Sequence, residues 1–146
     1  MIVSIASDHA GYDLRQQVIA HLKEKGFEVL DGGATNGTDA YSYVEAGKKI
    51  AEDVLSGRAD RGIAICGTGI GISIAANKVP GIRAGVVHSI ETAHWTKNHN
   101  DANVLCFGAR VVDLHTALAM VDEWLSTEFA GGKHERRIKE IEDLDF

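Results

Sequence analysis

The chain has 146 residues, in which 21 Asp and Glu outnumber 15 Lys and Arg, giving a net charge of -6 at pH 7. This balance excludes proteins whose main function is to bind nucleic acid, because there is no excess of basic side chains to displace counterions. No uncharged run is long enough to span a membrane, and the first residues lack the basic segment of a signal peptide. Two cysteines are too few for a disulfide framework. We therefore expect a cytoplasmic protein with reduced thiols and with no nucleic-acid or membrane partner.

Short β-branched apolar runs alternate along the chain with stretches of helical spacing. The runs predict strands at residues 2–6, 27–30, 62–66, 82–87 and 104–107. Helices are expected at residues 14–22, 44–55, 72–77, 90–97, 114–125 and, after two glycines, 134–141. This alternation predicts a five-stranded parallel sheet covered by helices on both faces. With no linker or internal repeat, residues 1–146 are expected to form one domain with a helical tail from about residue 132.

Sites in such sheets form outside the carboxyl ends of the strands. The rule predicts one crevice without the help of any motif. The loops expected to face it are residues 8–9, 31–39, 67–71, 88–89 and 108–110.

The stretch from Cys66 to Gly71, Cys-Gly-Thr-Gly-Ile-Gly, follows a predicted buried strand and opens a helix. Glycines let backbone N–H groups turn toward a ligand, and a helix start adds positive potential, so this loop suits an anion. It is not a Walker A loop, because no Gly-Lys-Ser/Thr follows. It is a poor dinucleotide fingerprint, because Ile72 stands at the third glycine position. The alternative is a tight turn that holds no ligand.

Cys66 ends the predicted strand immediately before this loop. One interpretation is a buried structural thiol, which is the usual fate of a free cysteine. The other is a base or a nucleophile, because amides at a helix start favour a thiolate. Cys106 lies inside an apolar strand and is interpreted as core, and Trp95 and Trp124 are interpreted as core or interface anchors rather than a stacking platform.

Candidate polar groups occur in the predicted loops and near the end of the chain. Asp8 can accept hydrogen bonds from sugar hydroxyls and His9 can contact a phosphate, while a helix N-cap is the alternative for Asp8. His99, in a polar loop, suits general acid catalysis unless it is only an exposed loop residue. Arg110 and Arg137 are candidate cations for a phosphate or a carboxylate, and a solvated helix is the alternative for Arg137. No group of His, Cys and Asp has the spacing of metal ligands.

Several blocks of this sequence occur together in one known family. They are Ser7-Asp8-His9-Ala10-Gly11, Ile65-Cys66-Gly67-Thr68-Gly69-Ile70-Gly71-Ile72-Ser73, Ala75-Ala76-Asn77-Lys78, His99-Asn100-Asp101-Ala102-Asn103-Val104-Leu105, Gly108-Ala109-Arg110 and Gly131-Gly132-Lys133-His134. Over nearly the whole chain the sequence closely resembles the ribose-5-phosphate isomerase B family, which also includes allose-6-phosphate and galactose-6-phosphate isomerases.

The resemblance implies a single Rossmann-like three-layer α/β/α domain that forms a homodimer, or a dimer of dimers, with a shared active site. It implies that an aldose phosphate and a ketose phosphate are interconverted without a metal or other cofactor. Cys66 matches the family's general base, His99 matches the acid that opens the sugar ring, and Asp8 assists at the ring hydroxyls. The loop that holds the enediolate matches Gly67, Thr68, Gly69, Ile70 and Gly71, with Thr68 counted among the catalytic residues. The other substrate and phosphate contacts match Asp8, His9, Asn100, Arg110, Lys133 and Arg137.

Two positions depart from the family pattern. The family usually reads Thr-Asp-Tyr-Pro after the second strand, whereas Ala40 stands here at the tyrosine position. Tyr41 and Tyr43 are the candidates to take the place of that aromatic ring. Lys133 stands where the family usually has an arginine, and a lysine offers a point charge in place of a bidentate fork. Both departures bear on which sugar phosphate is preferred.

The sequence favours an aldose–ketose isomerase, an intramolecular oxidoreductase, that interconverts ribose 5-phosphate and ribulose 5-phosphate of the pentose phosphate pathway. Such chemistry needs one base and an anion hole, which Cys66 and the loop after it would supply. The alternatives are an isomerase of allose 6-phosphate, galactose 6-phosphate or a tetrose phosphate. A Cys–His hydrolase with Cys66 as nucleophile and His99 as base, and a binding module without catalysis, are the other hypotheses.

Overall fold

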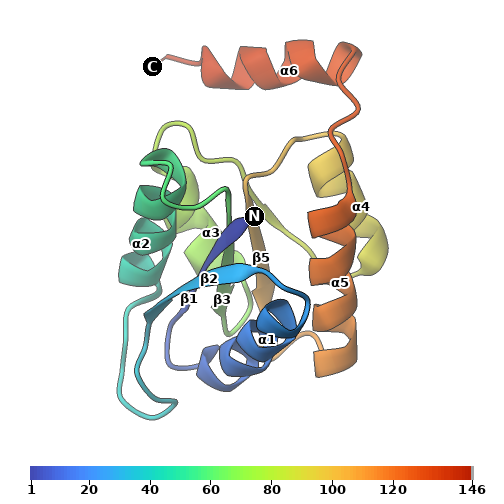
Figure 1. Cartoon of the computed structure of the whole chain (residues 1–146). Helices are drawn as coiled ribbons and strands as arrows, with labels where there is room; N and C mark the ends of the chain where they lie inside the picture. Colours follow the sequence, from blue (N-terminus) through green and yellow to red (C-terminus); the bar gives the residue numbers. More distant parts are fainter. Residues whose placement is uncertain (146) are drawn as a thin grey trace.

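The computed structural model describes residues 1–145 and contains a central parallel sheet with helices on both faces (Figure 1). The strands are β1 (Ile2–Ser7), β2 (Glu28–Gly33), β3 (Arg61–Cys66), β4 (Ala84–Val86) and β5 (Val104–Gly108). The helices are α1 (Tyr12–Glu24), α2 (Tyr43–Leu55), α3 (Ile70–Asn77), α4 (Ile90–Asn98), α5 (Leu114–Ser126) and α6 (Lys133–Glu142). All strand pairs are parallel, in the order β2-β1-β3-β5-β4, which confirms the expected α/β fold.

Several element boundaries differ from those that the sequence predicts. β2 continues through Gly32 and Gly33, because their backbones pair with the end of β1 even though glycine has a low strand propensity. α3 begins at Ile70, two residues earlier than expected, because Gly69 turns the chain with a φ of 82°. β4 is limited to three residues, so the predicted strand at 82–87 was too long.

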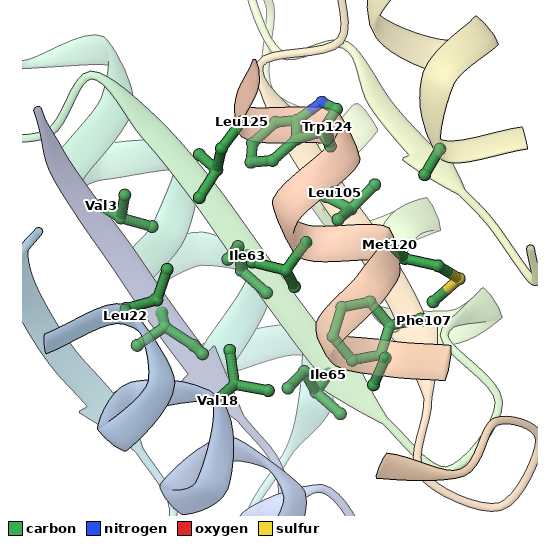
Figure 2. Packing of buried hydrophobic residues seen from close by; sticks show 14 of the residues in the cluster. Val3, Val18, Leu22, Ile63, Ile65, Leu105, Phe107, Met120, Trp124 and Leu125 are labelled. Atoms are coloured by element: carbon green, nitrogen blue, oxygen red, sulfur yellow. The ribbon is translucent and has the colours of Figure 1, made fainter. Parts of the chain in front are cut away.

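The two faces of the sheet bury separate apolar clusters. Helices α1, α4 and α5 cover one face, where the large side chains of β3 and β5 pack against α1 and α5 (Figure 2). The fully buried members there include Val3, Val18, Leu22, Ile63, Ile65, Leu105, Phe107, Met120 and Trp124. Helices α2 and α3 cover the other face, around Ile50, Ile72 and the small residues of the central strands. Burial on both faces explains why the central strands are apolar without alternation.

Side-chain caps fix where three of the helices begin. Ser42 accepts a hydrogen bond from the Val44 amide at the start of α2. Ser89 and Thr92 form a capping box at the start of α4, and Asp113 caps α5. Each cap satisfies amides that the first turn of a helix leaves free, so the preceding loops end at defined residues.

One buried carboxylate ties α2 to the sheet. Asp53 accepts hydrogen bonds from Ser4 Oγ of β1 at 2.7 Å and from Lys49 Nζ at 2.7 Å, and it pairs with Arg58 at 2.9 Å. Burial raises the pKa of Asp53, but the hydrogen bonds from Lys49, Ser4 and Arg58 outweigh it, so the pKa lies below its ordinary value. The ionised form is therefore the one that the fold stabilises.

The chain order reverses between β1 and β3, which is where a doubly wound sheet forms its ligand crevice. The loops after these two strands carry Asp8 and Cys66. Helix α6 lies away from this crevice, beyond the opposite, amino-terminal end of the sheet (Figure 1). None of its residues is buried. Within residues 1–145 no helix has the length and apolarity needed to cross a membrane.

Candidate active site

A pocket of about 280 Å³ opens at the carboxyl ends of β1, β3 and β5. The residues that line it are Asp8, His9, Ala10, Tyr43, Cys66, Gly67, Thr68, Gly71 and Arg110. The structure thus brings together most of the side chains that the sequence placed around one crevice. Two of the loops expected there do not line the pocket. Residues 31–35 line a separate pocket against Tyr12, Arg15 and Gln16 of α1. Residues 88–89 are too far away, because β4 lies at the edge of the sheet with β5 between it and β3.

Cys66 closes the buried side of this pocket. It is 4% exposed, and its Sγ accepts a hydrogen bond from the Gly69 amide at 3.2 Å. Only glycine fits at position 69, since φ is positive and an added Cβ would lie 2.7 Å from the Phe107 backbone. The glycine therefore allows a backbone N–H to point at the sulfur.

Cationic and hydroxyl groups stand beside this sulfur. The Arg110 guanidinium lies so close to Gly67 that an added Cβ there would be 2.9 Å from NH1. Within the described residues Arg110 forms no ion pair, so its charge is available to an anion in the pocket. The Thr68 hydroxyl accepts a hydrogen bond from the Ile70 amide at 3.2 Å, which leaves its proton for another acceptor.

Asp8 and His9 are both fixed by backbone amides. Asp8 is 7% exposed, and its Oδ1 accepts a hydrogen bond from the Gly11 amide at 3.1 Å. Asp8 is not the N-cap of α1, because Gly11 holds that position and Asp8 bonds the turn before the helix. His9 Nδ1 accepts a hydrogen bond from the Tyr41 amide at 3.2 Å, so the neutral ring carries its proton on Nε2.

Tyr43 is a pocket residue that sequence reasoning left unplaced. Its ring lies against the glycine loop, since a Cβ added at Gly71 would be 2.8 Å from two ring carbons. Tyr41 instead packs on the apolar cluster under α2 and α3, and Ala40 is exposed. Of the two tyrosines left open by the sequence, Tyr43 is therefore the one beside the glycine loop. Little in the sequence indicates this position, because Tyr43 is the first residue of α2 and faces the pocket only through the packing of α2 on α3.

The predicted residues His99, Asn100, Lys133 and Arg137 do not join this pocket. Helix α4 runs back along the sheet from the end of β4, so His99, its C-cap, lies at the amino-terminal end of the strands. The Gly62 amide at the start of β3 donates to the Asn103 carbonyl at that end. From Gly62 to Cys66 the strand rises about 13 Å. Within one chain, His99 is therefore far from the sulfur of Cys66.

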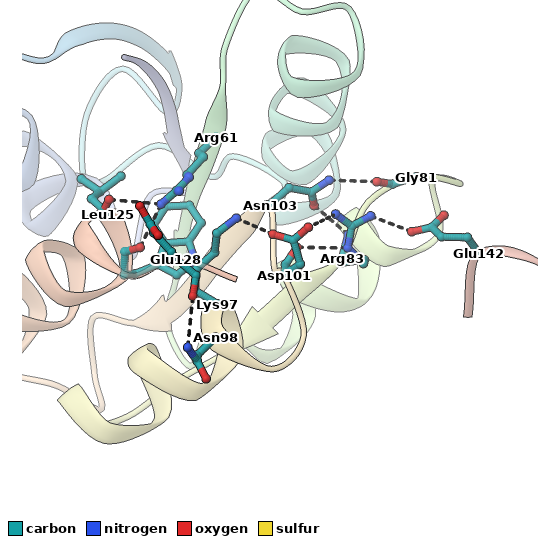
Figure 3. A network of polar contacts seen from close by, with 11 residues as sticks. Arg61, Gly81, Arg83, Lys97, Asn98, Asp101, Asn103, Leu125, Glu128 and Glu142 are labelled. Carbon is teal, nitrogen blue, oxygen red and sulfur yellow. Dashed lines mark hydrogen bonds and ion pairs between the residues drawn. The ribbon is translucent and has the colours of Figure 1, made fainter. Parts of the chain in front are cut away.

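A polar network fixes the loop that follows His99 (Figure 3). Arg83 Nε donates to the Asp101 carbonyl at 3.0 Å, and Arg83 NH1 pairs with Glu142 at the end of α6 at 2.7 Å. Lys97 Nζ donates to the Asp101 carboxylate, and Asp101 has a φ of 45°, in the left-handed region. The network therefore stabilises a backbone conformation that asparagine and aspartate tolerate better than most residues.

Helix α6 carries the cations expected to hold a phosphate. Lys133 and Arg137 stand one turn apart on it, and both are exposed. Neither pairs with a carboxylate within residues 1–145. The two charges are therefore free to bind an anion that lies outside this chain's own pocket.

Cys106 is fully buried, and burial raises the pKa of its thiol well above its ordinary value, which confirms it as core. No three His, Cys, Asp or Glu side chains among residues 1–145 converge to form a potential metal site.

Comparisons with known proteins agree with this geometry. The sequence model of the family described as ribose/galactose isomerase matches residues 3–141. Ribose-5-phosphate isomerase B of Escherichia coli (strain K12) is 43% identical, over 98% of this chain and 95% of the relative. The solved structure of Clostridium thermocellum ribose-5-phosphate isomerase B superposes with a TM-score of 0.96 at 50% identity, covering 98% of this chain and 96% of the other.

A second solved structure contains a sugar phosphate. It is ribose-5-phosphate isomerase B of Mycoplasma genitalium with bound ribulose-5-phosphate, which has a TM-score of 0.90 and 40% identity, covering 97% of this chain and 93% of the other. The match of the family model over nearly the whole chain, together with these relatives, establishes the relationship. The chain belongs to the ribose/galactose isomerase family.

Proposed function

We propose that this protein interconverts ribose 5-phosphate and ribulose 5-phosphate, with Cys66 as the general base. The observation that carries the proposal is the Gly69 amide 3.2 Å from Cys66 Sγ, in a pocket that also holds Asp8, Thr68 and Arg110. A base, backbone donors and a free cation around one small cavity are what aldose–ketose isomerisation requires. The relatives named for this reaction support the choice of substrate.

In this mechanism the Cys66 thiolate removes the proton from C2 of the open-chain aldose. The electron pair forms the C1–C2 double bond, and the carbonyl electrons move to O1, giving an enediolate. Amides of the loop from Gly67 to Gly71 stabilise the negative oxygen, because they are already oriented before charge develops. The thiol then returns the proton to C1 while the O2 proton is transferred to O1, so the ketose forms without net gain or loss of atoms. Asp8 and Thr68 hold the hydroxyls during these transfers.

A second copy of the chain completes the site in this proposal. His99, which would open the sugar ring, and the cations of α6 lie at the end of the sheet opposite Cys66. Beside the pocket, Tyr43, Val44, Ile70 and Ile74 form an exposed apolar surface, with Ile74 61% exposed. A two-fold dimer that buries this surface would bring one subunit's His99 to the other's Cys66, twice per dimer.

The phosphate would then be held from two sides. Arg110 approaches it from the pocket, and Lys133, Arg137 and Asn100 approach it from the second copy. In a chain with a net charge of -6, unpaired cations on one short helix are the groups suited to a doubly charged ligand. A thiol base needs a reducing compartment, so we place this one-domain protein in the cytoplasm.

The test is a turnover panel of tetrose, pentose and hexose phosphates in deuterated water, with Cys66→Ala beside the wild type. We expect the highest kcat/KM with ribose 5-phosphate, solvent deuterium in the product, and a loss greater than about a hundredfold in Cys66→Ala with phosphate binding retained. Activity on none of the sugars would refute the isomerase. A burst of covalent adduct without deuterium incorporation would instead support the Cys–His hydrolase.

A further inference from the structure

Two other rings lie against the imidazole of His99. The ring of His134 stacks on it, with centroids 4.1 Å apart and planes at 12°. The ring of Trp95, one turn earlier in α4, is tilted against it, with centroids 4.5 Å apart and planes at 31°. His134 belongs to α6, so the stack joins two helices that the sequence separates by more than thirty residues. Two aromatic rings from different helices therefore lie within stacking distance of His99.

The ring nitrogens of His99, in contrast, are free. Neither forms a hydrogen bond or an ion pair with any described residue, whereas His21 Nε2 binds Asp122 at 2.7 Å and His94 Nδ1 binds Glu123 at 3.0 Å. Facing rings fix the plane of an imidazole without using its nitrogens. This is the arrangement that a proton donor toward a substrate needs, because its orientation must be set before the substrate arrives.

We propose that Trp95 and His134 are positioning residues that hold His99 in the orientation required to open the sugar ring. The proposal rests on the proposed function, since it assumes that His99 donates a proton to the ring oxygen. One imidazole nitrogen gives its proton to O4 as the C1–O4 bond of the furanose breaks, and the Asp8 carboxylate accepts the proton that the C1 hydroxyl loses as C1 becomes the aldehyde. Neither Trp95 nor His134 takes part in that transfer.

Contacts before and after His134 in the sequence hold the C-terminal tail against the rest of the chain. Before α6, the Ala130 amide donates to the Asn98 carbonyl at 2.9 Å, and Asn98 Nδ2 donates to the Glu128 carbonyl at 3.1 Å. After the stack, Glu142 pairs with Arg83, which also binds the loop of Asp101 (Figure 3). Since no residue of α6 is buried, these contacts and the stack replace a hydrophobic anchor.

The charge state of the stack fits the same role. Burial, followed by the nearby His99, Lys133 and Arg137, lowers the pKa of His134 below its ordinary value. At neutral pH the ring of His134 is therefore uncharged, so the ring of His99 does not face a cation across the stack. Lys133 and Arg137 flank His134 in the same helix, so a phosphate bound there would lie close to His99.

The experiment compares His134→Ala with His134→Phe, which keeps a flat ring but carries no nitrogen. Glu135→Ala, an exposed change at the next position of α6, is the matched control, and circular dichroism checks folding in all variants. With ribose 5-phosphate we expect kcat to fall about tenfold in His134→Ala, as a misoriented acid loses part of its usual contribution. KM should stay within about threefold. His134→Phe should restore kcat to within about threefold of the wild type, and Glu135→Ala should match the wild type.

Three results would overturn the proposal. Equal loss in both His134 variants would mean that the imidazole nitrogens matter and the ring face does not. A rise in KM at unchanged kcat would make His134 a substrate contact, and unchanged kinetics in His134→Ala would make the stack irrelevant. A wild type that turns over no sugar phosphate would refute only the proposed function. In that case NMR tests the stack, because facing rings shift the His99 ring protons upfield. Unchanged His99 ring-proton shifts in His134→Ala would refute the stacking of His134 on His99.

Discussion

Mixing two inactive variants is expected to restore about a quarter of the wild-type activity. One variant is Cys66→Ala, and the other combines His99→Ala with Asn100→Ala. In one chain about 13 Å of strand separates the two ends of the sheet where these residues lie, so no side chain bridges them. If the site forms between two copies, each variant alone lacks a necessary group in both of its sites.

The magnitude follows from the symmetry. In a two-fold dimer each site takes Cys66 from one subunit and His99 from the other. A hybrid dimer then has one site with both groups and one site with neither. Random pairing of equal amounts makes about half of the dimers hybrids, and half of their sites are intact, which gives about a quarter of the wild-type activity.

The two variants would be mixed, unfolded, refolded together and assayed with ribose 5-phosphate, while native mass spectrometry counts the hybrid dimers. Each variant refolded alone is the control and should remain nearly inactive. Recovery should follow the hybrid fraction as the mixing ratio changes. Hybrid dimers without recovered activity would refute a site shared between Cys66 and His99 of different subunits.

Three other outcomes test separate parts of the structure. Arg137→Ala should raise KM for ribose 5-phosphate about tenfold or more, because an exposed, unpaired arginine would lose its phosphate contact; wild-type KM and kcat would make α6 a solvated helix. Prolonged dialysis against a chelator should leave turnover unchanged, because the proposed base and anion hole belong to the chain, and loss that one divalent ion restores would contradict this mechanism. Asp53→Asn should lower the free energy of unfolding by about 2 kcal/mol at pH 7, because ionic hydrogen bonds to Ser4, Lys49 and Arg58 are lost. Since the folded-state pKa of Asp53 is lowered, its contribution is present above about pH 4 and is lost as the pH falls through that pKa, so urea melts of the two proteins should converge in acid.

Much of the fold is encoded locally. Apolar strand runs and helical spacing predicted the alternation of strands and helices, because burial on both faces of a parallel sheet leaves a continuous apolar pattern. Boundaries were less accurate where pairing or a glycine turn decides them, as at Gly33 and Ile70. A single residue's propensity is small beside the hydrogen bonds that a neighbouring strand offers.

The sequence also determined half of the candidate site. Asp8, Cys66 and Arg110 each follow a strand directly, and the carboxyl ends of parallel strands meet at one edge, so chain position alone placed them in one pocket. Composition and loop chemistry made that pocket suitable for an anion. Family resemblance then named the roles, which the geometry around Cys66 Sγ supports.

Only the tertiary structure decided where the other half lies. The positions of His99 and Arg137 depend on how α4 and the C-terminal tail run back along the sheet. No local sequence pattern predicts the course of these segments. The same holds for Tyr43 against Gly71 and for the rings of Trp95 and His134 beside His99. Contacts between segments distant in sequence arise from packing, so a pattern along one chain cannot specify them.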